Sequence, residues 1–95
     1  MTAYVIAEID VTDPETYKAY TALTPASIAR HGGRFLVRGG PAEGLEGDSP
    51  KRIVVVEFDS VAAARRWYES PDYTEAKAIR ARAAESRLFI VEGAS

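Results

Sequence analysis

The sequence contains no cysteine, no asparagine and no glutamine, and it has a single histidine. The lack of cysteine excludes disulfides, thiol nucleophiles, zinc–thiolate sites and iron–sulfur clusters together. One histidine without other strong ligands does not make a zinc site, and haem ligation through it is not expected. We therefore predict that the protein holds no metal and no cofactor.

A large charge of one sign and a long apolar run are also missing. The formal net charge is −2, from 12 basic and 14 acidic residues, which offers no broad attraction to nucleic acid or anionic lipid. No apolar run approaches the ~20 residues that a membrane helix needs. Residues 1–10 lack the basic segment that begins a signal peptide. We expect a cytoplasmic protein that binds neither nucleic acid nor membrane.

The length of the chain sets its organisation. Ninety-five residues are the size of one domain, so residues 1–95 are expected to share a single core. A chain this short buries only roughly 60–65% of the surface that it exposes when unfolded. Association with a second molecule would therefore stabilise it.

Hydrophobic spacing predicts the order strand, helix, strand, strand, helix, strand. The helices follow the capping residues Asp13 and Ser60, Pro25 predicts a kink or restart in the first helix, and Ser70 predicts a restart in the second. The strands are expected over residues 4–11, 34–38, 53–58 and 88–92. This order predicts an α+β, ferredoxin-like β-α-β-β-α-β fold with a four-stranded antiparallel sheet.

Period-two alternation divides the strand residues between two faces of the sheet. The set expected beneath the helices is wholly apolar: Val5, Ala7, Ile9, Val11, Phe35, Val37, Val54, Val56, Phe58, Phe89 and Val91. The other set is mixed: Tyr4, Ile6, Leu36, Ile53, Val55, Leu88 and Ile90, with Glu8, Asp10, Arg34, Arg38, Glu57 and Glu92. Its apolar members form a larger patch than soluble monomers usually expose. We predict that a second copy covers this face, so that two sheets pair as a dimeric α/β barrel; a half-solvated sheet in a monomer is the alternative.

The charges on this second face predict a strand register. A register that sets Arg34 beside Glu57 gives that carboxylate a partner, which a buried charge requires. The same register sets Arg38 beside Ile53. It also allows Glu8 to lie close to Glu57, where like charge would raise the pKa of one carboxyl group.

Several segments resemble a known family. They are Tyr4–Ala7, Asp13–Tyr17 with Tyr20, Gly32–Gly40, Glu57–Phe58 with Ser60, Trp67–Tyr73 with Arg80, and Val91–Gly93. In these segments the chain is similar to domain-of-unknown-function family 1330, in the dimeric α/β-barrel superfamily. The resemblance implies a ferredoxin-like protomer and a sheet-to-sheet homodimer. The family has no assigned reaction, so it carries over no catalytic residue; cofactor-free monooxygenases, small isomerases and haem enzymes elsewhere in the superfamily are analogies of fold.

Two residues are candidates for proton transfer if the protein is an enzyme. His31 is the only histidine, but it stands at a predicted helix end, where a capping role suits it equally well. Glu57 is one of the carboxylates expected on the mixed face, and it is expected to be buried there beside Arg34. Either residue also has a purely structural interpretation.

Ligand-binding candidates are aromatic residues and arginines expected between the sheet and the helices. They are Tyr20, Arg38, Trp67, Tyr73 and Arg80. Aromatic residues at helical spacing suit a filled core as well as a pocket with phenol and indole donors. Arg80 on an apolar stripe either reaches solvent or anchors an anion, and the glycines after Arg38 serve either a turn or a ligand.

Two functions remain open on this basis. The first is a homodimer that binds a small apolar or aromatic acid, with or without cofactor-independent catalysis. The second is a non-catalytic regulatory or structural dimer without a ligand. A cavity within the ~300–1,000 Å³ typical of ligand sites favours the first function, and a filled interior favours the second.

Overall fold

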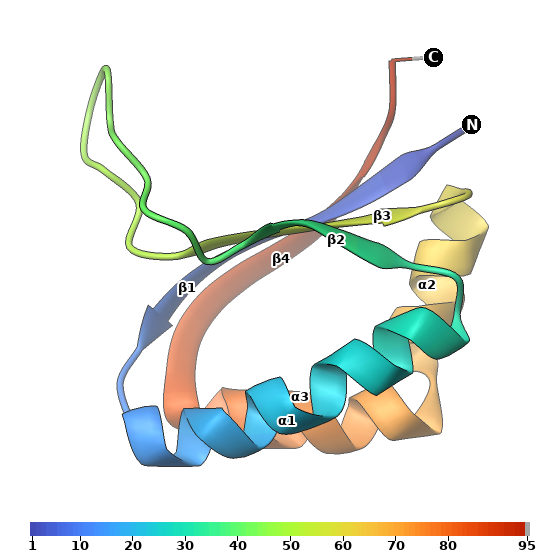
Figure 1. The fold of residues 1–95 in the computed structure, drawn as a ribbon, viewed down its shortest axis with the longest axis horizontal. Helices are drawn as coiled ribbons and strands as arrows, with labels where there is room; N and C mark the ends of the chain where they lie inside the picture. Colours follow the sequence, from blue (N-terminus) through green and yellow to red (C-terminus); the bar gives the residue numbers. More distant parts are fainter. Residues whose placement is uncertain (95) are drawn as a thin grey trace.

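The computed structural model describes residues 1–94. The elements are β1 (Ala3–Val11), α1 (Pro14–Arg30), β2 (Arg34–Arg38), β3 (Ile53–Phe58), α2 (Val61–Glu69), α3 (Pro71–Ala83) and β4 (Ala84–Glu92). The strands form one antiparallel sheet in the order β2-β3-β1-β4, and the helices lie on one side of it (Figure 1). The predicted α+β class and ferredoxin-like order are confirmed.

The helix boundaries follow from capping residues. Asp13 accepts a hydrogen bond from the Thr16 amide at 3.2 Å, which satisfies one of the free N–H groups that begin α1. Pro25 lies inside α1, which continues as one helix to Arg30, so the chain does not restart there. Ser70 closes α2 and caps α3, accepting from the Tyr73 amide at 3.3 Å, and the predicted second restart is confirmed.

Strand β4 is longer than predicted, and its faces are reversed. It begins at Ala84 and pairs with β1 so that Leu88 lies opposite Ala7 and Ile90 lies opposite Val5. Opposed residues of an antiparallel pair share a face, so Leu88 and Ile90 lie beneath the helices. Phe89 and Val91 lie on the other face. The predicted placement of these four residues is wrong. In an unbroken apolar run, no alternation of polar and apolar residues shows which side chains face the helices.

A bulge in β2 changes the phase of that strand. Phe35 pairs with Val56, whereas Val37 pairs with Val55, so Leu36 is an extra residue between them. One inserted residue moves every following side chain to the opposite face. Val37 therefore lies on the uncovered face, where Val55 also lies, and its predicted place beneath the helices is wrong.

The same bulge decides the position of Arg38. Arg34 pairs with Glu57 and forms an ion pair with it, as predicted. Beyond the bulge, Arg38 pairs with Val54 on the covered face. The prediction that Arg38 lies beside Ile53 on the mixed face is wrong.

The hydrophobic core fills the space between sheet and helices. Its buried members include Val5, Val56 and Phe58 from the strands, and Trp67 and Tyr73 from the helices. On the other side, the apolar residues that we call the open face are half-buried or exposed: Tyr4, Ile6, Leu36, Val37, Ile53, Val55, Phe89 and Val91. Within residues 1–94, no helix combines the length and apolar character needed to cross a bilayer.

Candidate functional site

A partly enclosed cavity lies between the sheet and α1. All strands contribute to its wall, together with α1 and α2. Its lining consists of Val5, Ala7, Ile9, Tyr17, Tyr20, Thr21, Thr24, Ile28, Phe35, Arg38, Arg52, Val54, Val56, Trp67 and Leu88. The space available to the centre of a water molecule is about 40 Å³, well below the ~300–1,000 Å³ of typical ligand sites. We call this space the inner cavity.

A groove adjoins the inner cavity beside α2 and β4. Its volume is about 330 Å³. Its lining is Val5, Arg65, Trp67, Tyr68, Leu88, Phe89 and Ile90. Because Val5, Trp67 and Leu88 line both spaces, their side chains are the partition between the groove and the inner cavity.

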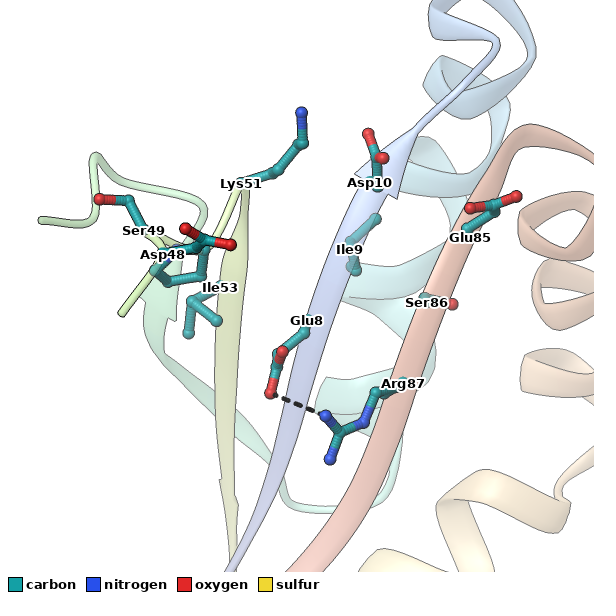
Figure 2. Close-up of a pocket in the computed structure, with 11 residues that line it drawn as sticks. Glu8, Ile9, Asp10, Asp48, Ser49, Lys51, Ile53, Glu85, Ser86 and Arg87 are labelled. Carbon is teal, nitrogen blue, oxygen red and sulfur yellow. Dashed lines mark ion pairs between the residues drawn. The ribbon is translucent and has the colours of Figure 1, made fainter. Parts of the chain in front are cut away.

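A third hollow lies on the uncovered side of the sheet, beside the loop that follows β2 (Figure 2). It is larger, about 640 Å³, but it is wide open and its lining is mainly charged, with Glu8 and Arg87 paired at 3.8 Å. Within residues 1–94, no cluster of three or more histidine, aspartate or glutamate side chains could hold a metal ion. We therefore take the inner cavity, with its apolar wall and few polar groups, as the candidate site.

Tyr20 contributes a neutral hydroxyl group to the inner cavity. Its oxygen lies 2.9 Å from the hydroxyl oxygen of Tyr73, which is fully buried behind it. Burial raises the pKa of both phenols above their ordinary value. The pair is therefore uncharged at physiological pH and can offer a ligand a hydrogen bond but no charge.

Trp67 is a rigid wall of the site. Its indole Nε1 donates to Ser27 Oγ at 3.2 Å, and its ring centroid lies 4.0 Å from that of Tyr73 and 5.5 Å from that of Phe58. Because the indole N–H already has an acceptor, Trp67 offers a ligand its ring surface.

Two arginines supply the positive charge. Arg38 lies over the Phe35 ring, with Cζ 4.3 Å from the ring centroid, and Arg52 lies over Tyr17 at 5.6 Å. Arg38 is exposed and Arg52 is half-buried, which places this pair at the mouth of the inner cavity. Sequence reasoning missed Arg52. The sequence signal was its spacing from Val54. Residues two apart along a strand point to the same face, so Arg52, two residues before Val54, is expected on the covered face.

Four predicted residues do not line the inner cavity: Tyr73, Arg80, His31 and Glu57. Arg80 donates from Nη1 to Ser86 Oγ, and its charge acts to lower the pKa of Tyr73, against the larger effect of burial. His31 ends α1, where its Nδ1 lies 2.9 Å from the Ser27 carbonyl oxygen. Glu57 lies on the uncovered side of the sheet. Among the residues predicted for the site, the structure brings Tyr20, Arg38 and Trp67 together, with Tyr73 behind Tyr20.

The expected proximity of Glu8 and Glu57 is wrong. Glu8 pairs with Ile53 on β3, whereas Glu57 lies opposite Tyr4, at the other end of the same strand pair. Four residues along a strand correspond to about 13 Å. Each carboxylate has an arginine partner of its own, Arg87 for Glu8 and Arg34 for Glu57.

Comparison with known proteins identifies a family and a shared fold. Residues 2–94 match the family described as domain of unknown function (DUF1330), as the sequence resemblance predicted. No curated protein sequence matches the chain.

Solved structures with this fold cover nearly the whole chain. A protein of unknown function from Rhodopseudomonas palustris is 22% identical, with a TM-score of 0.81, and the match covers 99% of this chain and 83% of that one. A dimeric ferredoxin-like protein of unknown function from Jannaschia is 11% identical, with a TM-score of 0.75 and coverage of 98% and 100%. SnoaB, a cofactor-independent oxygenase from Streptomyces nogalater, is 15% identical, with a TM-score of 0.71 and coverage of 99% and 94%.

Proposed function

This chain belongs to the DUF1330 family, and we propose that it is a homodimer that binds a small apolar or aromatic acid in the inner cavity. The observation that carries the proposal is the composition of the cavity wall. Apolar side chains predominate, accompanied by the hydroxyl groups of Tyr17, Tyr20, Thr21 and Thr24 and by the positive charges of two arginines at the mouth. Small-molecule sites typically combine an apolar wall with a few placed polar groups in this way.

The proposed dimer follows from the open face. Its central residues Ile6 and Val55 lie opposite each other on β1 and β3, and Val37 pairs with Val55 from the other side. Water-exposed aliphatic side chains in such a continuous patch are typical of a protein interface. The dimeric ferredoxin-like protein from Jannaschia, which shares this fold, supports a second copy as the partner.

The charge at the cavity mouth selects the class of ligand. Arg38 and Arg52 would attract the carboxylate of an acid, while rings such as Trp67 and Tyr17 would contact its apolar part. The free space of about 40 Å³ is too small for a benzene ring, so binding must move a side chain of the wall. The groove of about 330 Å³ beyond Trp67 offers room for this displacement.

The lining supports binding more than acid–base catalysis. Among the described residues that line the inner cavity, none is a carboxylate or a histidine, the groups that most often transfer protons in enzymes. SnoaB is a cofactor-independent oxygenase, but at 15% identity it shares only the fold. Catalysis without a cofactor would have to rely on the Tyr20 hydroxyl, the arginines and the reactivity of the substrate itself.

A second candidate function is a dimer without a ligand, in a regulatory or structural role. The narrow inner cavity favours it, because about 40 Å³ holds little more than water. The two functions differ in whether any small molecule stabilises the folded protein.

A thermal-shift screen against small aromatic acids tests the proposal. A ligand at 100 times its dissociation constant stabilises a folded protein by about 2.7 kcal/mol, which raises the melting temperature of a domain this small by roughly 10 °C or more. Arg38→Gln should reduce the shift, whereas Arg82→Gln, an exposed residue on α3, should not. If no acid at millimolar concentration raises the melting temperature, the dimer without a ligand is the better account.

A further inference from the structure

We propose that Arg38 and Arg52 form a two-point anion subsite, in which both guanidinium groups bind the carboxylate of the ligand and its apolar part points into the inner cavity. This inference rests on the proposed function and deepens it, because it has both guanidinium groups bind one carboxylate together and gives the unpartnered Nε of Arg52 an acceptor. Arg52 is the new element.

The strand register brings the two arginines together. Arg38 pairs with Val54, and Arg52 precedes Val54 by two residues, just before β3 begins at Ile53, and it lines the same cavity on the covered face. Such diagonal positions on neighbouring strands are about 7–8 Å apart, within reach of two long side chains. Two guanidinium groups that approach each other at the cavity mouth repel each other, and an anion held between them would remove the repulsion.

No acidic side chain of the described chain neutralises this pair. The ion pairs found within residues 1–94 are Lys18–Glu15, Arg30–Asp72, Arg34–Glu57 and Arg87–Glu8. On the sheet, the ion pairs at Glu8 and Glu57 lie on the uncovered side, separated from the inner cavity by the backbone of the sheet. The cavity arginines are thus the sheet cations available to an external anion.

Arg52 is already held in position for such a contact. Its guanidinium lies over Tyr17 and against Gly39, where an added β-carbon would clash with Arg52 Cζ. Gly39 has φ +78°, so both its backbone and its missing side chain suit this close approach. Gly39, the first of the two glycines after Arg38, therefore makes room for Arg52.

Arg52 also lacks an acceptor. Its Nε is buried and has no hydrogen-bond partner among the described residues. A buried donor without a partner is unfavourable, because it has lost its water and gained nothing in exchange. The Nε and Nη groups on one edge of a guanidinium match the two oxygens of a carboxylate, so a carboxylate would satisfy this donor.

The experiment observes the arginine Nε–H resonances of the ¹⁵N-labelled protein during titration at constant ionic strength. Sodium acetate probes the anion subsite alone. Matched pairs of one acid and its amide, benzoate with benzamide and phenylacetate with phenylacetamide, then probe the whole site. We expect acetate to shift the Nε–H signals of Arg52 and Arg38 but not that of Arg82, and each acid to bind about tenfold more tightly than its amide or better.

The variants Arg52→Gln and Arg82→Gln complete the design. In Arg52→Gln the acid should lose its advantage over the amide, whereas Arg82→Gln should keep it. If acetate shifts Arg52 but the aromatic acids bind no more tightly than acetate, the subsite stands and the proposed function fails.

If acids and amides bind equally and the Arg52 signal does not move, the subsite is wrong while the proposed function stands. If no probe binds, both are wrong. The titration that follows the Arg52 signal uses the unmodified protein. It therefore tests the anion subsite even if Arg52→Gln fails to fold.

Discussion

Apolar side chains are buried to different extents on the two faces of the sheet. On the covered face, the helices supply partners for Val56 and Phe58, which are 2% and 1% exposed. On the open face, Val37 and Val91 are each 41% exposed, although their side chains are of the same kind. The single chain thus buries one apolar layer and leaves the other partly exposed.

Charge is also distributed differently between the two faces. The open face carries cross-strand ion pairs, Arg34 with Glu57 and Arg87 with Glu8. The covered face carries Arg38 and Arg52 at one end of an apolar cavity. This difference is the basis of our proposals that the open face associates with a copy of itself and that the covered face binds an anion.

The largest effect is expected from a charge in the middle of the open face. Val55→Asp would place a carboxylate at the centre of the proposed interface, twice in a symmetric dimer. An unpaired charge in a dry interface is strongly unfavourable, so the dissociation constant should rise roughly 100-fold or more. Sedimentation equilibrium measures it. Leu45→Asp, in a loop where Leu45 is 89% exposed, is the control that should leave the dimer intact.

The tight packing of the covered face should be revealed by a pair of glycine substitutions. In Gly33→Ala the new β-carbon would lie 2.6 Å from the Phe58 ring and 2.8 Å from Ile28, so side chains must shift at a cost of about 1–3 kcal/mol. In Gly40→Ala the new carbon meets nothing within 4 Å. Urea unfolding should separate the two variants, and equal stabilities would contradict the packing described here.

A double-mutant cycle on Tyr20 and Tyr73 tests whether polar groups on the covered face are stable only as pairs. Each single change to phenylalanine leaves one buried hydroxyl group without its 2.9 Å partner, which should lower the free energy of unfolding by about 1–3 kcal/mol. The double variant should cost less than the sum of the two. Strict additivity in the unfolding data would show that the hydroxyl groups do not interact.

The smallest effect concerns the helix caps, which lie away from both faces. Hydrogen bonds from Thr16 lower the pKa of Asp13, so its ionised form is favoured in the folded state. The resulting stabilisation is complete above the ordinary pKa of 3.8 and is lost as the pH falls through the lower folded value. The melting temperature of wild type relative to Asp13→Asn should therefore fall on acidification below about pH 4. A constant difference would exclude this contribution.

Local signals predicted most of the fold. Caps such as Asp13 and Ser70 are read from adjacent residues, and the structure confirms the helix starts that they predict. Which residues of a strand face the helices is not determined by adjacent residues in this way. In β4 the alternatives Leu88 and Phe89 are both apolar, so only the pairing with β1 decides which of them faces the helices.

The candidate site was predictable in its chemistry but not in its full membership. Tyr20, Trp67 and Arg38 were selected by residue type, yet Arg38 reaches the covered face only because Leu36 forms a bulge. Neither a bulge nor a buried Nε without an acceptor has a clear sequence signature. The spacing of Arg52 from Val54 is visible in the sequence, but its position beside Arg38 at the cavity mouth follows only from the strand pairing.

The central claim is that a second copy of the chain covers the open face. Sedimentation equilibrium of the unmodified protein at micromolar concentration tests it most directly. The account predicts a single species of about twice the chain mass of 10.3 kDa. A species of 10.3 kDa at every concentration would contradict the claim, because the open face would then be stable in water.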